Sequence, residues 1–206
     1  MKKNYIISFA VIFLLLLPAS TLAQLVKIGA GGGITQVLAP DGITKKVSEG
    51  GLGYSTEWNI GLIGKVDLPL IPITPRAFLL YHTFAGDGTN PSSQNVENSQ
   101  SVFEIGAGAQ YNFIPAPLGF DPYIALDLSF NSFGDFNQNI DGVETKYSGN
   151  TRFGGGVGIG TEVTIIPLIN LDLYLSYKML NLVGKESGEE TISAVTLDAF
   201  IIFNFL

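Results

Sequence analysis

The stretch 101–131 alternates apolar and polar residues in two long runs, and this alternation constrains the fold more than any other feature of the chain. In the first run the apolar parity holds Phe103, Ile105, Ala107, Ala109, Tyr111 and Phe113. In the second run it holds Ile124, Leu126, Leu128 and Phe130. A period of two predicts β-strands, because successive side chains of a strand point to opposite sides. The runs exceed the usual strand length of about five or six residues, which is typical of strands that contact lipid on one face and a polar interior on the other.

The first residues of the chain have the pattern of a secretory signal peptide. Lys2 and Lys3 precede an apolar run at 6–17, and small residues follow up to Ala23. This arrangement predicts cleavage after Ala23, so that residues 1–23 are a leader and residues 24–206 form one domain. An uncleaved membrane anchor is the alternative, but the apolar run is short for a membrane-spanning helix.

The same alternation predicts eight strands, at residues 26–35, 54–67, 75–84, 103–113, 123–131, 151–166, 171–180 and 191–206. In the third strand Phe78 and Leu80 break the pattern, and we set its register by placing Arg76 and His82 inside. The predicted connections alternate between long polar loops (36–53, 85–100, 132–149 and 181–190) and short turns that contain Pro69, Pro115 or Pro167. We therefore expect an all-β fold, an eight-stranded antiparallel up-and-down transmembrane β-barrel with both termini in the periplasm.

Many of the inward positions are ionisable. They are Lys27, Glu57, Lys65, Asp67, Arg76, His82, Glu104, Asp127, Arg152, Glu162, Asp172, Lys178 and Asp198. An eight-stranded barrel is just wide enough for side chains to fill it, and buried charges must be paired. We expect an ion-pair network that fills the lumen; a narrow gated conduit or a proton path is the alternative.

Aromatic residues gather at both ends of the outward faces. Tyr111, Phe113, Phe203 and Phe205 fall near one rim, and Trp58, Tyr81, Phe153 and Tyr177 fall near the other. Two such girdles are typical of barrels in a bilayer. Chance is the alternative, because aromatic residues are common in any strand.

We expect no catalytic site, metal site or cofactor. The chain has no cysteine and one histidine, His82, and it lacks a Gly-x-Ser-x-Gly motif. Its glycine-rich runs are not followed by a helical pattern, which excludes a dinucleotide-binding loop. Asp141, Glu186, Glu189 and Glu190 lack the spacing of a calcium loop, so we expect solvated loops that face lipopolysaccharide. Acidic residues (18) outnumber basic ones (11), which argues against a nucleic-acid partner.

With these features the chain resembles the small outer-membrane β-barrel proteins of the OmpA/OmpX type. It resembles more closely the outer membrane protein beta-barrel domain family of Gram-negative bacteria, over residues 24–206. In such families the last strand has alternating aromatic residues and ends in Phe, and the barrel-assembly machinery recognises it. Phe203 and Phe205 match that pattern, whereas the final residue is Leu206. The resemblance implies a location in the outer membrane, contact with its lipid and lipopolysaccharide, and a monomer.

These observations favour a non-enzymatic barrel that serves envelope structure or surface interaction through its loops. The alternatives are an outer-membrane enzyme that modifies lipid, a narrow pore, and a secreted lipocalin-like barrel that binds an apolar ligand. The lipocalin-like alternative inverts the faces, because its apolar parity would point inward.

Overall fold

The computed structural model describes residues 25–68, 71–113 and 119–205. The predicted leader 1–23, Pro69, Pro115 and Leu206 lie outside the described residues.

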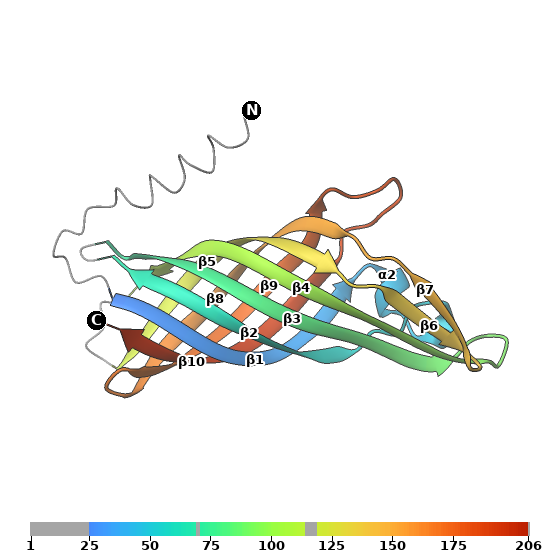
Figure 1. Ribbon diagram of the computed structural model, residues 1–206, viewed down its shortest axis with the longest axis horizontal. Coiled ribbons are helices and arrows are strands. Elements are labelled where there is room, and N and C mark those ends of the chain that lie inside the picture. The colour runs from blue at the N-terminus through green and yellow to red at the C-terminus, as the bar shows by residue number, and fades with distance from the viewer. Residues whose placement is uncertain (1–24, 69–70, 114–118, 206) are drawn as a thin grey trace, which may run out of the picture.

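Eight antiparallel strands form a closed barrel (Figure 1). They are β1 (Leu25–Ala39), β2 (Thr56–Asp67), β3 (Ile73–Thr89), β4 (Asn95–Asn112), β5 (Phe120–Phe133), β8 (Thr151–Ile166), β9 (Ile169–Val183) and β10 (Ser193–Phe205). Each of these eight strands pairs with the strand before it and the strand after it in this list, and the pairing of β1 with β10 completes the ring. The predicted fold class is confirmed.

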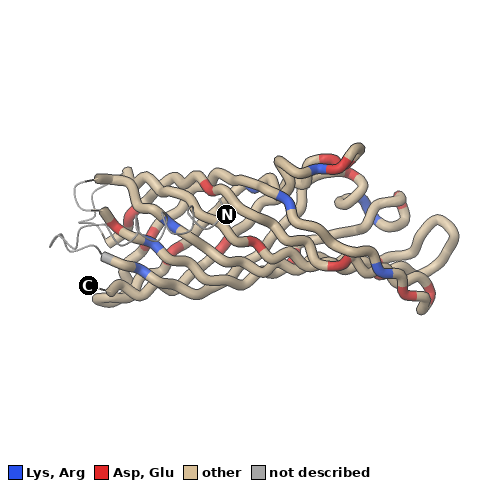
Figure 2. Tube along the Cα trace, turned by 45° about the horizontal axis from the view of Figure 1, so that its top comes forward, with Lys and Arg blue, Asp and Glu red and all other residues tan. Residues whose placement is uncertain are grey.

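The start of β1 lies beside the end of β10, where Val26 pairs with Phe205. We call this the proximal end of the barrel, which is on the left in Figure 1. The opposite end, on the right, is the distal end. Charged positions run along the barrel and continue into the distal end (Figure 2).

The apolar parity points outward on the strands. On β5, Leu126 is 68% exposed, whereas Asp127 and Asn131 on the other parity are buried. An inward apolar face, as a lipocalin-like barrel requires, is therefore wrong for this chain. An apolar outer wall is the surface that a barrel presents to lipid.

The break in alternation on β3 has a packing reason. Arg76 and His82 are buried inside, and so are Phe78 and Leu80 between them. The two apolar side chains pack inside the lumen against Ile63 of β2 and against β10. This inward apolar cluster interrupts the charged lining of the lumen, and for this reason the inward positions of β3 are not all polar.

Two of the predicted long loops are largely β-structure. The hairpin of β3 and β4 continues to Thr89 and Asn95, well into the predicted loop 85–100. The predicted loop 132–149 holds a further hairpin, β6 (Phe136–Ile140) and β7 (Val143–Tyr147), and β6 pairs with β4. These strands extend beyond the barrel wall at the distal end (Figure 1). The loop predictions were wrong here because a strand that extends beyond the apolar wall needs no apolar face.

The predicted loop 36–53 is the third exception. β1 continues through it to Ala39, and the helices α2 (Asp41–Thr44) and η1 (Val47–Glu49) follow at the distal end. Both helices are short, and over the part of the chain that the structure describes we find no helix long and apolar enough to cross a membrane.

Candidate functional site: the charged lumen

One wall of the lumen carries a row of three cations. The register pairs Lys27 of β1 with Lys65 of β2, and Lys65 with Arg76 of β3. All three side chains are buried. Like charges directly opposite each other destabilise a sheet, so this wall needs anions from elsewhere.

The opposite wall carries a row of acids. Asp121 of β5 pairs with Glu162 of β8, and Glu162 pairs with Asp172 of β9. Asp127 lies further along β5. The two rows have complementary charges, and apart from Asp67 of β2, which contacts Lys27, the counter-charges of the cations lie on the far wall.

Salt bridges cross the lumen between the two rows. The Nζ atom of Lys65 lies 2.8 Å from Glu162 and 2.8 Å from Asp172, and Lys27 Nζ lies 2.8 Å from Glu162. Arg76 Nε lies 3.1 Å from Asp127, and a second guanidinium nitrogen donates to the same carboxylate at 3.2 Å. Charged pairs therefore cross the lumen from one wall to the other.

Two tyrosines complete this layer. The Tyr123 hydroxyl donates to Asp172 at 2.7 Å, and the Tyr174 hydroxyl donates to Asp127 at 2.8 Å. Their rings stack with centroids 5.9 Å apart, and the Arg76 guanidinium lies 4.1 Å from the Tyr174 ring centroid. A desolvated cation over a ring gains attraction beyond its salt bridge.

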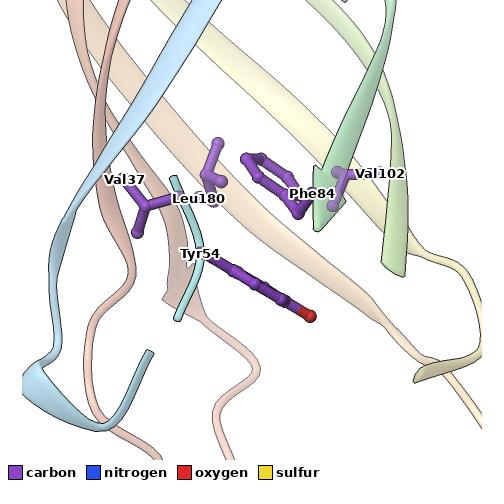
Figure 3. Close-up of a cluster of buried hydrophobic side chains, with 5 residues drawn as sticks. All are labelled: Val37, Tyr54, Phe84, Val102 and Leu180. Atoms are coloured by element: carbon purple, nitrogen blue, oxygen red, sulfur yellow. The ribbon is translucent and has the colours of Figure 1, made fainter. Parts of the chain in front are cut away.

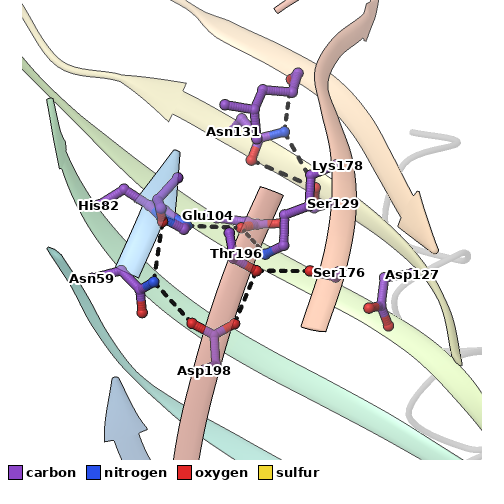
Figure 4. A network of polar contacts seen from close by, with 12 residues as sticks. Asn59, His82, Glu104, Asp127, Ser129, Asn131, Ser176, Lys178, Thr196 and Asp198 are labelled. Carbon is purple, nitrogen blue, oxygen red and sulfur yellow. Dashed lines mark hydrogen bonds and ion pairs between the residues drawn. The ribbon is translucent and has the colours of Figure 1, made fainter. Parts of the chain in front are cut away.

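Figure 4 shows a second polar layer. It lies further toward the distal end, because its His82 follows Arg76 along β3. Glu104 accepts from Lys178 at 2.6 Å and lies 3.0 Å from His82 Nε2. Asp198 forms no salt bridge with any described residue; its carboxylate accepts hydrogen bonds from Asn59 at 2.8 Å and from Thr196 at 3.1 Å. The layer is a hydrogen-bonded network in which only part of the charge is paired.

The arrangement of Thr35, His82 and Glu104 places a hydroxyl, an imidazole and a carboxylate in line. Thr35 Oγ1 lies 3.0 Å from His82 Nδ1, and Glu104 bonds the other ring nitrogen. The side chains of His82 and Glu104 are 1% and 2% exposed. Both groups are therefore closed off from solvent, whereas a catalytic base must come within hydrogen-bond reach of its substrate.

An apolar cluster closes the distal end of the lumen. Val37, Tyr54, Phe84, Val102 and Leu180 point toward one another there (Figure 3). The cavity among these and neighbouring side chains measures about 10 Å³, at the lower limit for one water molecule. The sequence had no signal for this cluster, because its members come from strands and from the loop before β2.

Arg152 differs from the other predicted lumen cations. It faces inward near the distal mouth, and its guanidinium contacts Glu189 at 2.7 Å and Glu186 at 3.2 Å. These acids belong to the loop that we expected to be solvated, so the loop folds over the mouth. The hydrogen bonds from Arg152 lower the pKa of Glu189 to about 2.

Two further predicted members lie at the rims. Glu57 is half-buried at the distal rim and accepts a hydrogen bond from Ser55. Asp67 is one-third exposed at the proximal rim and contacts Lys27 at 2.8 Å. The lumen network that crosses between walls is therefore smaller than the predicted set.

The predicted girdle residues lie on the outer face, most of them exposed. At the proximal end the Tyr111 and Phe113 rings pack edge to face, with centroids 5.7 Å apart. Phe203 and Phe205 are exposed on β10 at the same end. At the distal end the ring centroids of Trp58 and Tyr81 lie 6.3 Å apart. Tyr177 is exposed, and Phe153 is half-buried against Phe130. Within the described residues no group of three or more His, Cys, Asp or Glu is placed to hold a metal ion.

A model of the outer membrane protein beta-barrel domain matches residues 9–198. The chain belongs to this family. A search of curated proteins gives no match.

Solved outer-membrane barrels share the fold. Neisserial surface protein A is 18% identical, with a TM-score of 0.53, over 88% of this chain and 97% of that one. The attachment invasion locus protein of Yersinia pestis is 11% identical, with a TM-score of 0.54, over 88% and 99%. A major outer membrane protein from Thermus thermophilus is 12% identical, with a TM-score of 0.55, over 87% and 99%. The family and these structures indicate a protein of the bacterial outer membrane.

Proposed function

We propose that this protein is a closed, non-enzymatic barrel that stabilises the outer membrane and interacts at the cell surface through its distal end. The observation that carries the proposal is the set of salt bridges across the lumen. Lys65, Glu162 and Asp172 join three strands with side chains no more than 3% exposed. Breaking a buried pair costs several kcal/mol, about 3–5 when one partner is removed, so the closed arrangement is strongly favoured.

The burial of His82 and Glu104 supports a non-enzymatic role. A lipid-modifying enzyme needs a nucleophile that its substrate can reach, and the hydroxyl of Thr35 is buried with them. Incubation of the purified protein with labelled lipid A tests this point. Release of acyl chains above a boiled control would contradict it.

In this proposal the proximal end faces the periplasm and the distal end faces outward. The longer distal connections, which hold the β6–β7 hairpin and the short helices, support this orientation. The aromatic residues at both ends would then lie at the two bilayer interfaces, next to lipid and lipopolysaccharide. The barrel-assembly machinery would recognise Phe203 and Phe205 in β10, and the barrel would act as a monomer.

Conductance in a planar bilayer tests the closed barrel. We expect the purified protein to show no steady current at neutral pH, because side chains fill the lumen. A pore-forming protein added afterwards shows that the bilayer responds. A large, stable, ohmic conductance from the protein alone would contradict the proposal and favour a pore.

Surface interaction has its own supporting observation, the charge of the distal end. Acidic residues outnumber basic ones there: Asp41, Glu49, Asp87, Glu97, Asp135, Asp141, Glu144, Glu186, Glu189 and Glu190 against Lys45, Lys46, Lys146, Arg152 and Lys185. Asp87 and Glu97 are direct cross-strand partners, an unfavourable pair, and neither forms a salt bridge with any described residue. This surface suits a cationic partner.

The attachment invasion locus protein is described in complex with a heparin analogue, sucrose octasulfate. The acidic distal end here disfavours such a polyanion. We expect the protein in lipid nanodiscs to bind a polylysine surface at low salt, to lose that binding as salt rises, and not to bind heparin. Tight binding to heparin would contradict the assignment of a cationic partner.

A further inference from the structure

The proximal mouth of the lumen holds a polar cavity of about 280 Å³. It is lined by side chains from six strands, among them Lys27, Asp67, Asp121, Glu162, Asn170 and Asn204. Asp67 is one-third exposed at the rim, whereas Glu162 at the inner side is 3% exposed. The cavity therefore opens outward at the proximal end and is closed by the salt bridges above it.

Three oxygen atoms of this cavity are buried and have no hydrogen-bond partner among the residues that the structure describes. They are Asp121 Oδ1, Asn170 Oδ1 and Asn204 Oδ1. Asn170 is only 8% exposed, and its amide nitrogen donates to Glu162 at 3.2 Å, which leaves its oxygen for the cavity. Buried acceptors of this kind are nearly always satisfied, so the cavity requires a donor.

The ionised groups around the cavity are mostly negative. Lys27 is shared between Asp67 and Glu162, at 2.8 Å from each. Among the described residues Asp121 forms no salt bridge, and its side chain accepts a hydrogen bond from the amide of Asn112. The occupant should therefore be positively charged, and anions are excluded.

We propose that this cavity binds a primary ammonium group that enters from the proximal end. A primary ammonium carries one positive charge and three N–H donors, which matches the three unpartnered oxygens. A metal ion fits less well, because no group of three or more His, Cys, Asp or Glu among the described residues is placed to hold one. The volume suits a small head group, and either a free alkylamine or a lysine side chain of a polypeptide can supply it.

Calorimetric titration of the mature protein in lipid nanodiscs tests the site. The probe is n-butylammonium chloride, and tetramethylammonium chloride is the control cation that has the same charge but no N–H donor. We expect saturable binding of butylammonium only. Asp121→Asn and Asn204→Ala should each weaken it at least tenfold, whereas Asn95→Ala, the same change as Asn204→Ala but at the exposed distal end, should leave it unaltered.

Folded barrels show a shift in gel mobility on heating, and this shift verifies that each variant is folded. If Asp121→Asn does not fold, Asn204→Ala at the rim tests the site in its place. A short peptide with one lysine side chain and blocked ends distinguishes the two sources. Tighter binding of the peptide assigns the site to a polypeptide partner, and equal binding assigns it to a free amine; both support an ammonium site. Equal binding of tetramethylammonium, binding of calcium that the amine cannot displace, or no saturable binding by folded protein would each overturn the proposal.

Discussion

Lys65 on β2 and Arg76 on β3 are direct cross-strand partners, so two buried cations lie side by side in one wall of the barrel. Their counter-charges come from the far wall, where Lys65 contacts Glu162 and Arg76 contacts Asp127. Closing the barrel therefore brings each of these two cations to its counter-charge.

We predict that Lys65→Met destabilises the barrel by about 3–5 kcal/mol, because Asp172 loses the cation that lies 2.8 Å away. Urea-induced unfolding in lipid vesicles measures the change. Adding Asp172→Asn to Lys65→Met should recover part of the loss. Lys45→Met removes an exposed pair with Asp41 and should leave stability unaltered; equal losses for Lys45→Met and Lys65→Met would count against the role of the lumen pairs.

The wall of the barrel could be predicted from the sequence because lipid imposes a pattern on it. Every second residue of β5 must be apolar to face lipid, so Leu126 and Leu128 fix the register of Asp127 between them. Outside the bilayer this requirement disappears. The strands around Val96 and Val143 carry polar residues on both faces, and their sequences are therefore indistinguishable from loops.

The partners inside the lumen could not be predicted. Lys27 and Glu162 are 135 residues apart, and their contact depends on the stagger of the strands around the ring. Alternation gives the face of a residue but not its height along the barrel axis. For the same reason Arg152 was assigned to the lumen network, whereas its height places it beside Glu189 of the distal loop.

The inward glycines make room for particular aromatic side chains. A Cβ atom on Gly158 would lie 2.6 Å from the Tyr174 ring and 2.5 Å from the carbonyl oxygen of Leu175. We predict that Gly158→Ala costs about 1–3 kcal/mol through overpacking. Gly64→Ala is the matched control, because the nearest atom to its Cβ would lie 3.9 Å away. Refolding into lipid vesicles should separate the two, and equal stability would argue against close packing around Tyr174.

The contact of Arg152 with Glu189 predicts a loop that is released in acid. The pKa of Glu189 falls from 4.5 to about 2 in the folded protein, so its hold on the loop is complete above about pH 4.5 and is lost as the pH falls toward 2. The chain has no cysteine, so a spin label on Ser187→Cys reports loop mobility. Mobility should rise below pH 4.5 in the parent and should be high at every pH in Arg152→Gln. Glu190→Gln should resemble the parent. A loop that is immobile in Arg152→Gln would show that the contact of Arg152 with Glu189 does not hold the loop.

The outward face of β8 tests the position of the membrane. Ile159 is 59% exposed in the middle of this strand, and its neighbours Ile124 and Leu175 share the outer wall. If lipid covers this wall, Ile159→Arg should destabilise the barrel by about 2–4 kcal/mol, because a charge near the midplane of a bilayer is costly. Val143→Arg is the matched control, since Val143 on β7 is 69% exposed on a strand that extends beyond the wall. Water already surrounds that side chain, so the same charge should cost little there.

Both variants are compared by reversible unfolding in lipid vesicles and again in detergent. In detergent the penalty for Ile159→Arg should shrink, because micelles deform around a charge more easily than a bilayer. Equal losses for the two variants in vesicles would mean that lipid does not distinguish the barrel wall from the distal strands.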